Sequence, residues 1–82
     1  MINDQIHTAP QSPMRKKTDY IVACVNEFAR ACSLDVSQAY RYLEIHGGID
    51  FLVEHYDTEH TLSFDDAIED LKAVSRQTGG RI

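Results

Sequence analysis

Apolar side chains recur every three or four residues in four segments of the sequence: residues 19–31, 36–46, 49–56 and 64–77. This spacing places the apolar residues of each segment on one face of an α-helix. The run in the third segment is also compatible with a buried strand, but a single short strand would have no partner in this chain. The pattern therefore predicts four helices and no sheet.

Polar residues that favour helix starts precede three of these segments. Thr18 is expected to cap the first helix. Asp35 with Gln38, and Ser63 with Asp66, have the spacing of a capping box, in which side chains at both positions bond backbone amides. These caps predict where the first, second and fourth helices begin.

The first helix is expected at the centre of the core, because Tyr20 and Ala31 widen its apolar face beyond a narrow stripe. In the second helix, Tyr40 falls on the apolar face, which predicts a buried ring. Tyr42 is expected to be exposed. A sharp corner follows this helix, where Gly47 can take the left-handed conformation.

Short connections between the helices predict an all-α fold, a compact, orthogonal or loosely bundled four-helix single domain. This helical domain is expected over residues 18–78. Residues 1–17 contain two prolines and few large apolar side chains, so they are expected to form a flexible, disordered tail. Residues 79–82 follow the last helix as a frayed end.

The charge is unevenly distributed. The chain has 13 acidic and 8 basic residues, and residues 44–70 hold nine carboxylates and three histidines but no lysine or arginine. A short basic cluster, Arg15, Lys16 and Lys17, lies in the expected tail. Because an acidic surface repels a phosphate backbone, nucleic-acid binding by the folded body is disfavoured. The charge instead favours recognition of a basic partner.

The sequence has no apolar run near the roughly 20 residues that span a bilayer, and its N-terminus lacks a signal-peptide core. The expected location is the cytoplasm, with no membrane partner.

Cys24 and Cys32 lie eight residues apart in one predicted helix, about 12 Å along its axis, which is too far for a disulfide. Both are expected to be packed, reduced thiols.

Sequence motifs for catalysis and metal binding are not matched. His55 and His60, with Asp57 and Glu59 between them, offer metal ligands, but histidines five residues apart do not share the helix face that a zinc motif requires. The carboxylates of residues 65–70 lie on one predicted helix and cannot face each other across a cleft. We therefore expect no enzymatic activity, no cofactor and no bound metal.

The carboxylates of the last helix predict a binding surface. Asp65 with Glu69, and Asp66 with Asp70, are like-charge pairs four residues apart, each destabilising by a few tenths of a kcal/mol. The helix dipole offsets part of this cost, and a basic partner would relieve the rest, although a merely solvated face is the alternative. With neighbouring aromatic residues favoured at interfaces, the candidate partner-binding residues are Tyr42, Glu54, His55, Tyr56, Asp57, Glu59, His60, Asp65, Asp66 and Glu69.

Three stretches resemble a known family: YIVACVNEFA (residues 20–29), AYRYLEIHGGIDFLVEHYD (39–57) and HTLSFDDAIEDL (60–71). They are similar to small bacterial domains of unknown function that share the order Gly-Gly-Ile-Asp-Phe-Leu, Glu-His-Tyr-Asp, His-Thr and Asp-Asp-Ala. Members are often encoded beside a protein that looks like an ADP-ribosyltransferase toxin. The resemblance implies an antitoxin or immunity role, and no catalytic residues.

The acidic surface and the resemblance together predict a non-enzymatic protein-interaction module, an antitoxin- or immunity-type inhibitor that binds a partner enzyme through an acidic helical surface. The expected partner is a protein, from the resemblance an ADP-ribosyltransferase-like toxin, and a homodimer stays open. Two alternatives also stay open: a nucleic-acid-associated regulator that uses the basic tail, and a phage-type inhibitor whose carboxylates imitate DNA phosphates.

Overall fold

The computed structural model describes residues 13–81, which contain five helices and no strand, so the all-α prediction is confirmed. Residues 1–12 of the expected tail, and residue 82, lie outside the described range. Across that range, no helix is both long and apolar enough to cross a membrane. The helices are α2 (Pro13–Cys32), α3 (Val36–Ile45), α4 (Gly48–Glu54), α5 (Tyr56–Glu59) and α6 (Phe64–Gln77).

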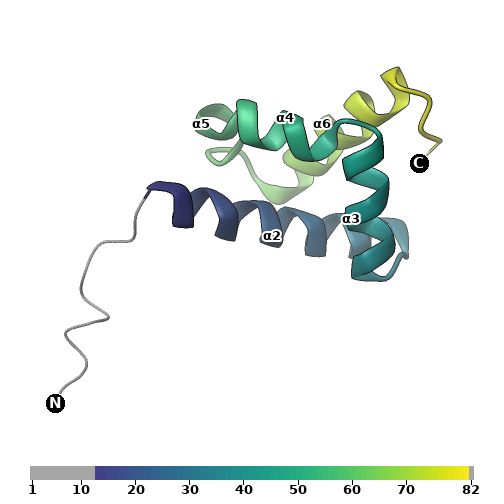
Figure 1. Cartoon of the computed structure of the whole chain (residues 1–82), viewed down its shortest axis with the longest axis horizontal. Coiled ribbons are helices and arrows are strands. Elements are labelled where there is room, and N and C mark those ends of the chain that lie inside the picture. Colours follow the sequence, from purple (N-terminus) through teal and green to yellow (C-terminus); the bar gives the residue numbers. More distant parts are fainter. Residues whose placement is uncertain (1–12, 82) are drawn as a thin grey trace, which may run out of the picture.

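Helix α2 is the central element of the domain. Helix α3 crosses its C-terminal end, α4 and α5 run back beside α2, and α6 lies behind α4 (Figure 1). Helices α3, α4 and α6 all contact α2. This arrangement agrees with the expectation that the first predicted helix lies at the centre of the core.

Helix α2 begins at Pro13, earlier than the sequence pattern predicts. A proline is well suited to the first position of a helix, because its missing N–H would have no partner there. Thr18 lies inside the helix, and its hydroxyl donates to the carbonyl of Met14 at 3.0 Å. The prediction of Thr18 as an N-cap is therefore wrong, and residues 13–17, which were expected in the tail, are helical.

The cap of α3 is the predicted capping box, and the cap of α6 shows one of its two predicted bonds. The carboxylate of Asp35 accepts from the Gln38 backbone N–H at 2.8 Å, and Gln38 Oε1 accepts from the Asp35 N–H at 3.1 Å. This is the predicted capping box. At α6, Ser63 Oγ accepts from the Asp66 N–H at 3.1 Å, and the helix spans the predicted residues.

The corner between α3 and α4 is built from two glycines, as predicted. Gly47 has a φ of +81°, in the left-handed region that a side chain disfavours. Gly48 is buried, and a Cβ there would lie 2.7 Å from Leu43 Cδ2, so a side chain at this position would force Leu43 to shift. Helix α4 ends at Glu54, and the single turn of α5 occupies part of the connection expected over residues 57–62.

The core joins four of the helices. Its largest fully buried apolar side chains are Phe28, Leu43, Leu52, Leu71 and Cys24. Burying a large apolar side chain stabilises the fold by about 1.5–3 kcal/mol, so these residues dominate the stability.

The two tyrosines of α3 are reversed relative to the prediction. Tyr40 is 45% exposed, whereas Tyr42 is half-buried and stacks on Phe28, with ring centroids 5.8 Å apart. Tyr40 and Tyr42 flank the face of α3 that buries Ala39 and Leu43, one on each side. Tyr42 is the more buried of the two because its side of α3 packs on Phe28 of α2.

Candidate protein-binding surface

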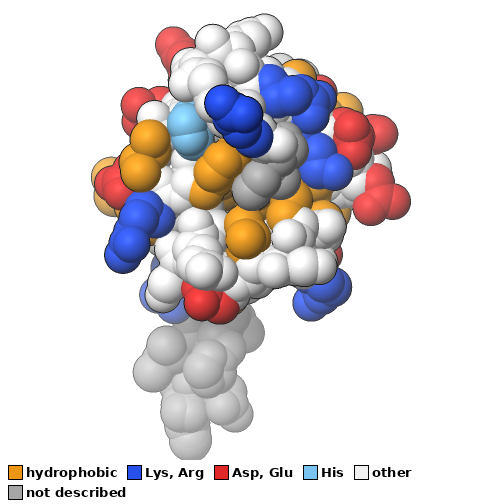
Figure 2. Space-filling view, turned by 90° about the vertical axis from the view of Figure 1, so that its right-hand side faces the viewer, with side chains coloured by type: hydrophobic (Ala, Val, Ile, Leu, Met, Phe, Trp, Pro, Cys, Tyr) orange, Lys and Arg blue, Asp and Glu red, His pale blue; other side chains and the backbone are white. Residues whose placement is uncertain are grey.

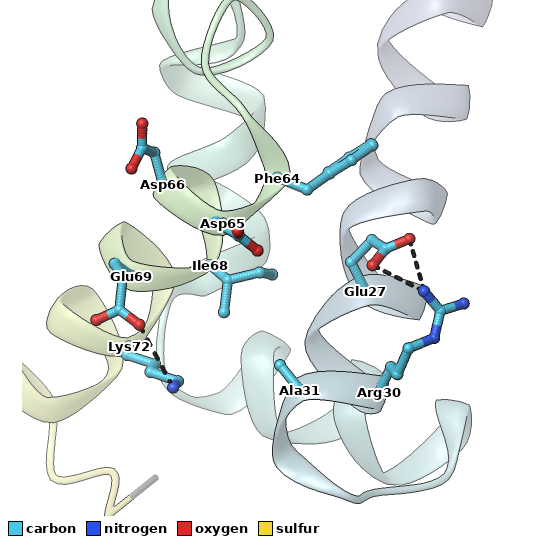
Figure 3. Close-up of a pocket in the computed structure, with 9 residues that line it drawn as sticks. All are labelled: Glu27, Arg30, Ala31, Phe64, Asp65, Asp66, Ile68, Glu69 and Lys72. Carbon is cyan, nitrogen blue, oxygen red and sulfur yellow. Dashed lines mark hydrogen bonds and ion pairs between the residues drawn. The ribbon is translucent and has the colours of Figure 1, made fainter.

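A charged groove of about 370 Å³ lies between α2 and α6 (Figure 3). We call it the acidic groove, because four of its six charged residues are carboxylates. Its lining residues are Glu27, Arg30 and Ala31 from α2 and Phe64, Asp65, Asp66, Ile68, Glu69 and Lys72 from α6.

Both cations of the acidic groove are already paired. Arg30 Nη1 lies 3.0 and 3.1 Å from the two carboxylate oxygens of Glu27, and Lys72 Nζ lies 3.5 Å from Glu69. Among residues 13–81, the carboxylates of Asp65 and Asp66 have no ion-pair partner within 4.0 Å. The groove therefore keeps two unneutralised negative charges.

The positions of these two carboxylates follow from the start of α6. Both lie in its first turn, where the helix dipole favours negative charge. In Figure 3 the side chain of Asp65 points toward the space between the two helices, whereas that of Asp66 points away from α2. Both are exposed to solvent. A cationic group entering the groove would meet Asp65 first.

An aromatic cluster borders the acidic groove and connects α2, α5 and α6. The Tyr20 ring stacks against Phe64 at 6.2 Å and meets the edge of Tyr56 at 5.6 Å. The rings of Tyr56 and His60 stack at 4.4 Å, and Lys17 Nζ lies 5.6 Å above the Tyr56 ring. Since Phe64 belongs to both groups, aromatic and acidic side chains form one continuous surface.

Glu59 lies below this surface rather than on it. It is only 4% exposed, and within the described residues its Oε1 has no hydrogen-bond partner. Burial, together with a hydrogen bond to Asp70 and the charge of that residue, raises the pKa of the Glu59 carboxyl to about 7. Tyr20 donates to the Glu59 backbone carbonyl at 3.0 Å, so this residue fixes α5 against α2.

The other predicted site residues lie elsewhere. Glu54, His55 and Asp57 are exposed near the end of α4, with His55 Nε2 3.8 Å from Glu54. Tyr42 packs on the core, and its ring centroid lies 4.6 Å from that of His46. The structure thus gathers Tyr56, His60, Asp65, Asp66 and Glu69 at one surface.

Sequence reasoning missed the α2 side of the acidic groove. Glu27, Arg30 and Ala31 lie three and four residues apart, so they share one face of α2. That spacing is visible in the sequence, but the helix they face is not.

The end of the molecule near α3 and the C-terminus carries lysine and arginine side chains around a group of apolar ones (Figure 2).

The histidines of the predicted site make local contacts. His60 Nδ1 lies 2.7 Å from the Tyr56 carbonyl. Within residues 13–81, no three or more histidine, cysteine or acidic side chains are grouped so that they could hold a metal ion.

Cys24 and Cys32 are free thiols, and burial raises the pKa of each, which disfavours the reactive thiolate.

Comparison with known proteins gives a family but no function. No curated protein and no solved structure matches this chain significantly. The family model described as "Protein of unknown function (DUF3791)" matches residues 19–77. This segment begins within α2 and ends with the last residue of α6, so it contains the whole acidic groove and the buried core. Because the match covers most of the domain described above, the chain belongs to the DUF3791 family.

Proposed function

We propose that this chain is a non-enzymatic protein-interaction module that inhibits a partner enzyme by placing its acidic groove over a basic region of that enzyme. The observation that carries the proposal is the pairing pattern in the groove. Arg30 and Lys72 are neutralised, while Asp65 and Asp66 keep their charge beside an exposed aromatic ring. An arginine or lysine of a partner would supply the missing cation.

The aromatic cluster supports the same interpretation. Protein interfaces are enriched in aromatic side chains, which bury large areas at a low entropic cost. Phe64 is 41% exposed and His60 is exposed, and both lie next to the acidic residues of α6. A partner that covered them would gain apolar contact as well as charge pairing.

The partner that we propose is an ADP-ribosyltransferase-like toxin in the cytoplasm, which the resemblance to toxin-neighbouring domains suggests. An enzyme that binds a dinucleotide needs basic side chains that bind the pyrophosphate of the dinucleotide. An acidic protein surface can compete for those groups, and electrostatic attraction would also speed the encounter. The module would then act as an antitoxin by blocking the substrate site.

The test is co-expression of the chain with the protein encoded beside it, followed by purification at moderate salt and a toxicity assay. We expect a stoichiometric complex and relief of toxicity. The variant Asp65→Asn with Asp66→Asn should weaken binding about tenfold or more, because two desolvated charge pairs are lost.

The matched control is Asp19→Asn with Asp50→Asn. It removes the same charge from two exposed positions outside the acidic groove, so it should bind nearly as the natural chain does. If both double variants weaken binding equally, the effect comes from net charge and the assignment to the groove fails. If no complex forms and toxicity persists, the proposed function fails.

A further inference from the structure

The side of α2 that faces away from the acidic groove is apolar and exposed. Met14, Thr18 and Val22 follow one another at four-residue spacing, and Met14 and Val22 are 78% and 53% exposed. From Met14 to Val22 this stripe covers a little over two helical turns, about 12 Å along the axis. Its length is typical of a helix-packing surface and not of an isolated apolar side chain.

Two hollows accompany this stripe. One, of about 570 Å³, lies between α2 and α4 and is lined by Met14, Lys17, Thr18, Ile21 and Val53. The other, of about 490 Å³, lies between α2 and α3 and is lined by Val22, Val25, Val36, Ser37, Tyr40, Arg41 and Glu44. The α2 residues of the first hollow are followed directly along the helix by those of the second. We call the two hollows together the apolar groove.

We propose that this apolar groove is the interface of a symmetric homodimer, in which α2 of one chain packs antiparallel to α2 of a second copy. A two-fold axis near the middle of the stripe places the α4 end of each groove against the α3 end of the other. The exposed ring of Tyr40 then covers Met14 and Val53 of the second copy. Tyrosine is a frequent anchor of such interfaces.

The charges at the two ends of the groove favour a second copy as the occupant. Lys17 lines the α4 end, and Glu44 lines the α3 end. An antiparallel two-fold arrangement therefore brings Lys17 to Glu44 of the second copy, twice in each dimer. The groove is thus complementary in charge to itself.

The size of the domain supports the same occupant. A chain of 82 residues buries a smaller fraction of its surface than a larger protein does, so its core is limited. Dimerisation through the apolar groove would bury Met14, Val22, Val36, Tyr40 and Val53, each of which is at least 44% exposed in the single chain. These residues would extend the core across the two-fold axis.

The first test is sedimentation equilibrium of the purified full chain over a wide concentration range. We expect a dimer whose dissociation constant rises at least about tenfold in Val22→Glu. Ile45→Glu is the matched control, because Ile45 is 66% exposed but does not line the groove. Circular dichroism verifies that both variants fold. A natural chain that stays monomeric throughout, or equal effects of both variants, would overturn the proposal.

The second test is a charge exchange between Lys17 and Glu44. Lys17→Glu and Glu44→Lys should each weaken the dimer, because each places like charges together twice. An equimolar mixture of the two variants should recover dimers, since both contacts of the mixed pair are again opposite in charge. Failure of the mixture to recover dimers contradicts the antiparallel arrangement and favours a helix of another protein as the occupant. Both tests use this chain alone, so their failure is distinguishable from failure of the proposed function.

Discussion

The two sides of α2 differ in whether their exposed side chains have partners within the chain. Toward α6, the helix presents Glu27 and Arg30, which pair with each other in the acidic groove. Toward α3 and α4, it presents Met14 and Val22, which remain in contact with solvent. Exposed ion pairs contribute little to stability, about 0–1 kcal/mol, and exposed apolar side chains contribute nothing until something covers them.

Neither surface is therefore needed to hold the fold together. The stability comes from the layer between them, where Phe28, Leu43, Leu52 and Leu71 are fully buried. A protein whose acidic and apolar grooves add little to its own stability can use both of them for binding. Substitutions in the core and in the two grooves should therefore differ in how much they change the free energy of unfolding.

The largest effect is expected where α3 faces the core. Tyr42→Ala should destabilise the fold by about 2–3 kcal/mol, because the ring stacks on Phe28 and lies against Gly80. Tyr40→Ala should change the stability of the single chain by less than about 0.5 kcal/mol. Urea unfolding at low protein concentration measures both. Similar losses in the two variants would mean that the apolar groove already contributes to the fold.

A smaller effect is expected from the carboxyl buried beneath the acidic surface. The pKa of Glu59 is raised to about 7 by burial and by Asp70, so the folded state favours the protonated form. This contribution is fully present below the ordinary pKa of 4.5 and is lost as the pH rises through 7. Glu59→Gln should therefore stabilise the protein by about 2 kcal/mol at pH 8 and change it little at pH 4.

Thermal unfolding of the two proteins across this pH range measures the effect. The titratable groups around Glu59 include Tyr20 and Cys24 from α2, Tyr56 from α5 and Asp70 from α6. Burial raises the pKa values of Tyr20 and Cys24, so neither ionises in this range. A stability difference that does not depend on pH would show that Glu59 is not the group that titrates.

The smallest effect is expected at the acidic surface itself. Asp65→Asn with Asp66→Asn removes two like-charge pairs but also two charges that favour the start of α6. These contributions oppose each other, so the free energy of unfolding should change by less than about 0.5 kcal/mol. Urea unfolding at low and high salt measures it. A loss above 1 kcal/mol would assign these residues to folding instead of binding.

The elements that the sequence predicts well are governed by local chemistry. The capping box of Asp35 and Gln38, and the cap of Ser63 on Asp66, depend on residues three positions apart. The glycine corner depends on Gly47 alone for its positive φ. Thr18 failed as a cap because α2 continues through it without interruption. A residue type that favours a helix start does not create one where Pro13 already provides it.

The parts that the sequence does not predict depend on contacts between helices. Whether Tyr40 or Tyr42 is buried depends on which side of α3 packs against Phe28 of α2, and the apolar pattern of α3 does not determine that side. The burial of Glu59 depends on α5 lying against α2, where Tyr20 holds the Glu59 carbonyl. The acidic groove needs Glu27 opposite Asp65, two residues far apart in the chain that α2 and α6 bring to one surface.

Helix α2 lines both grooves, and this shared position has a consequence for avidity. Helical spacing places Glu27 and Arg30 on the side opposite Ile21 and Val25. A dimer joined through the apolar grooves would thus carry its two acidic grooves on outward-facing sides, held at a fixed separation by α2. Such a pair is bivalent: the first contact with a repetitive target raises the effective concentration for the second. Residence time would then depend on target spacing as well as on the strength of one groove.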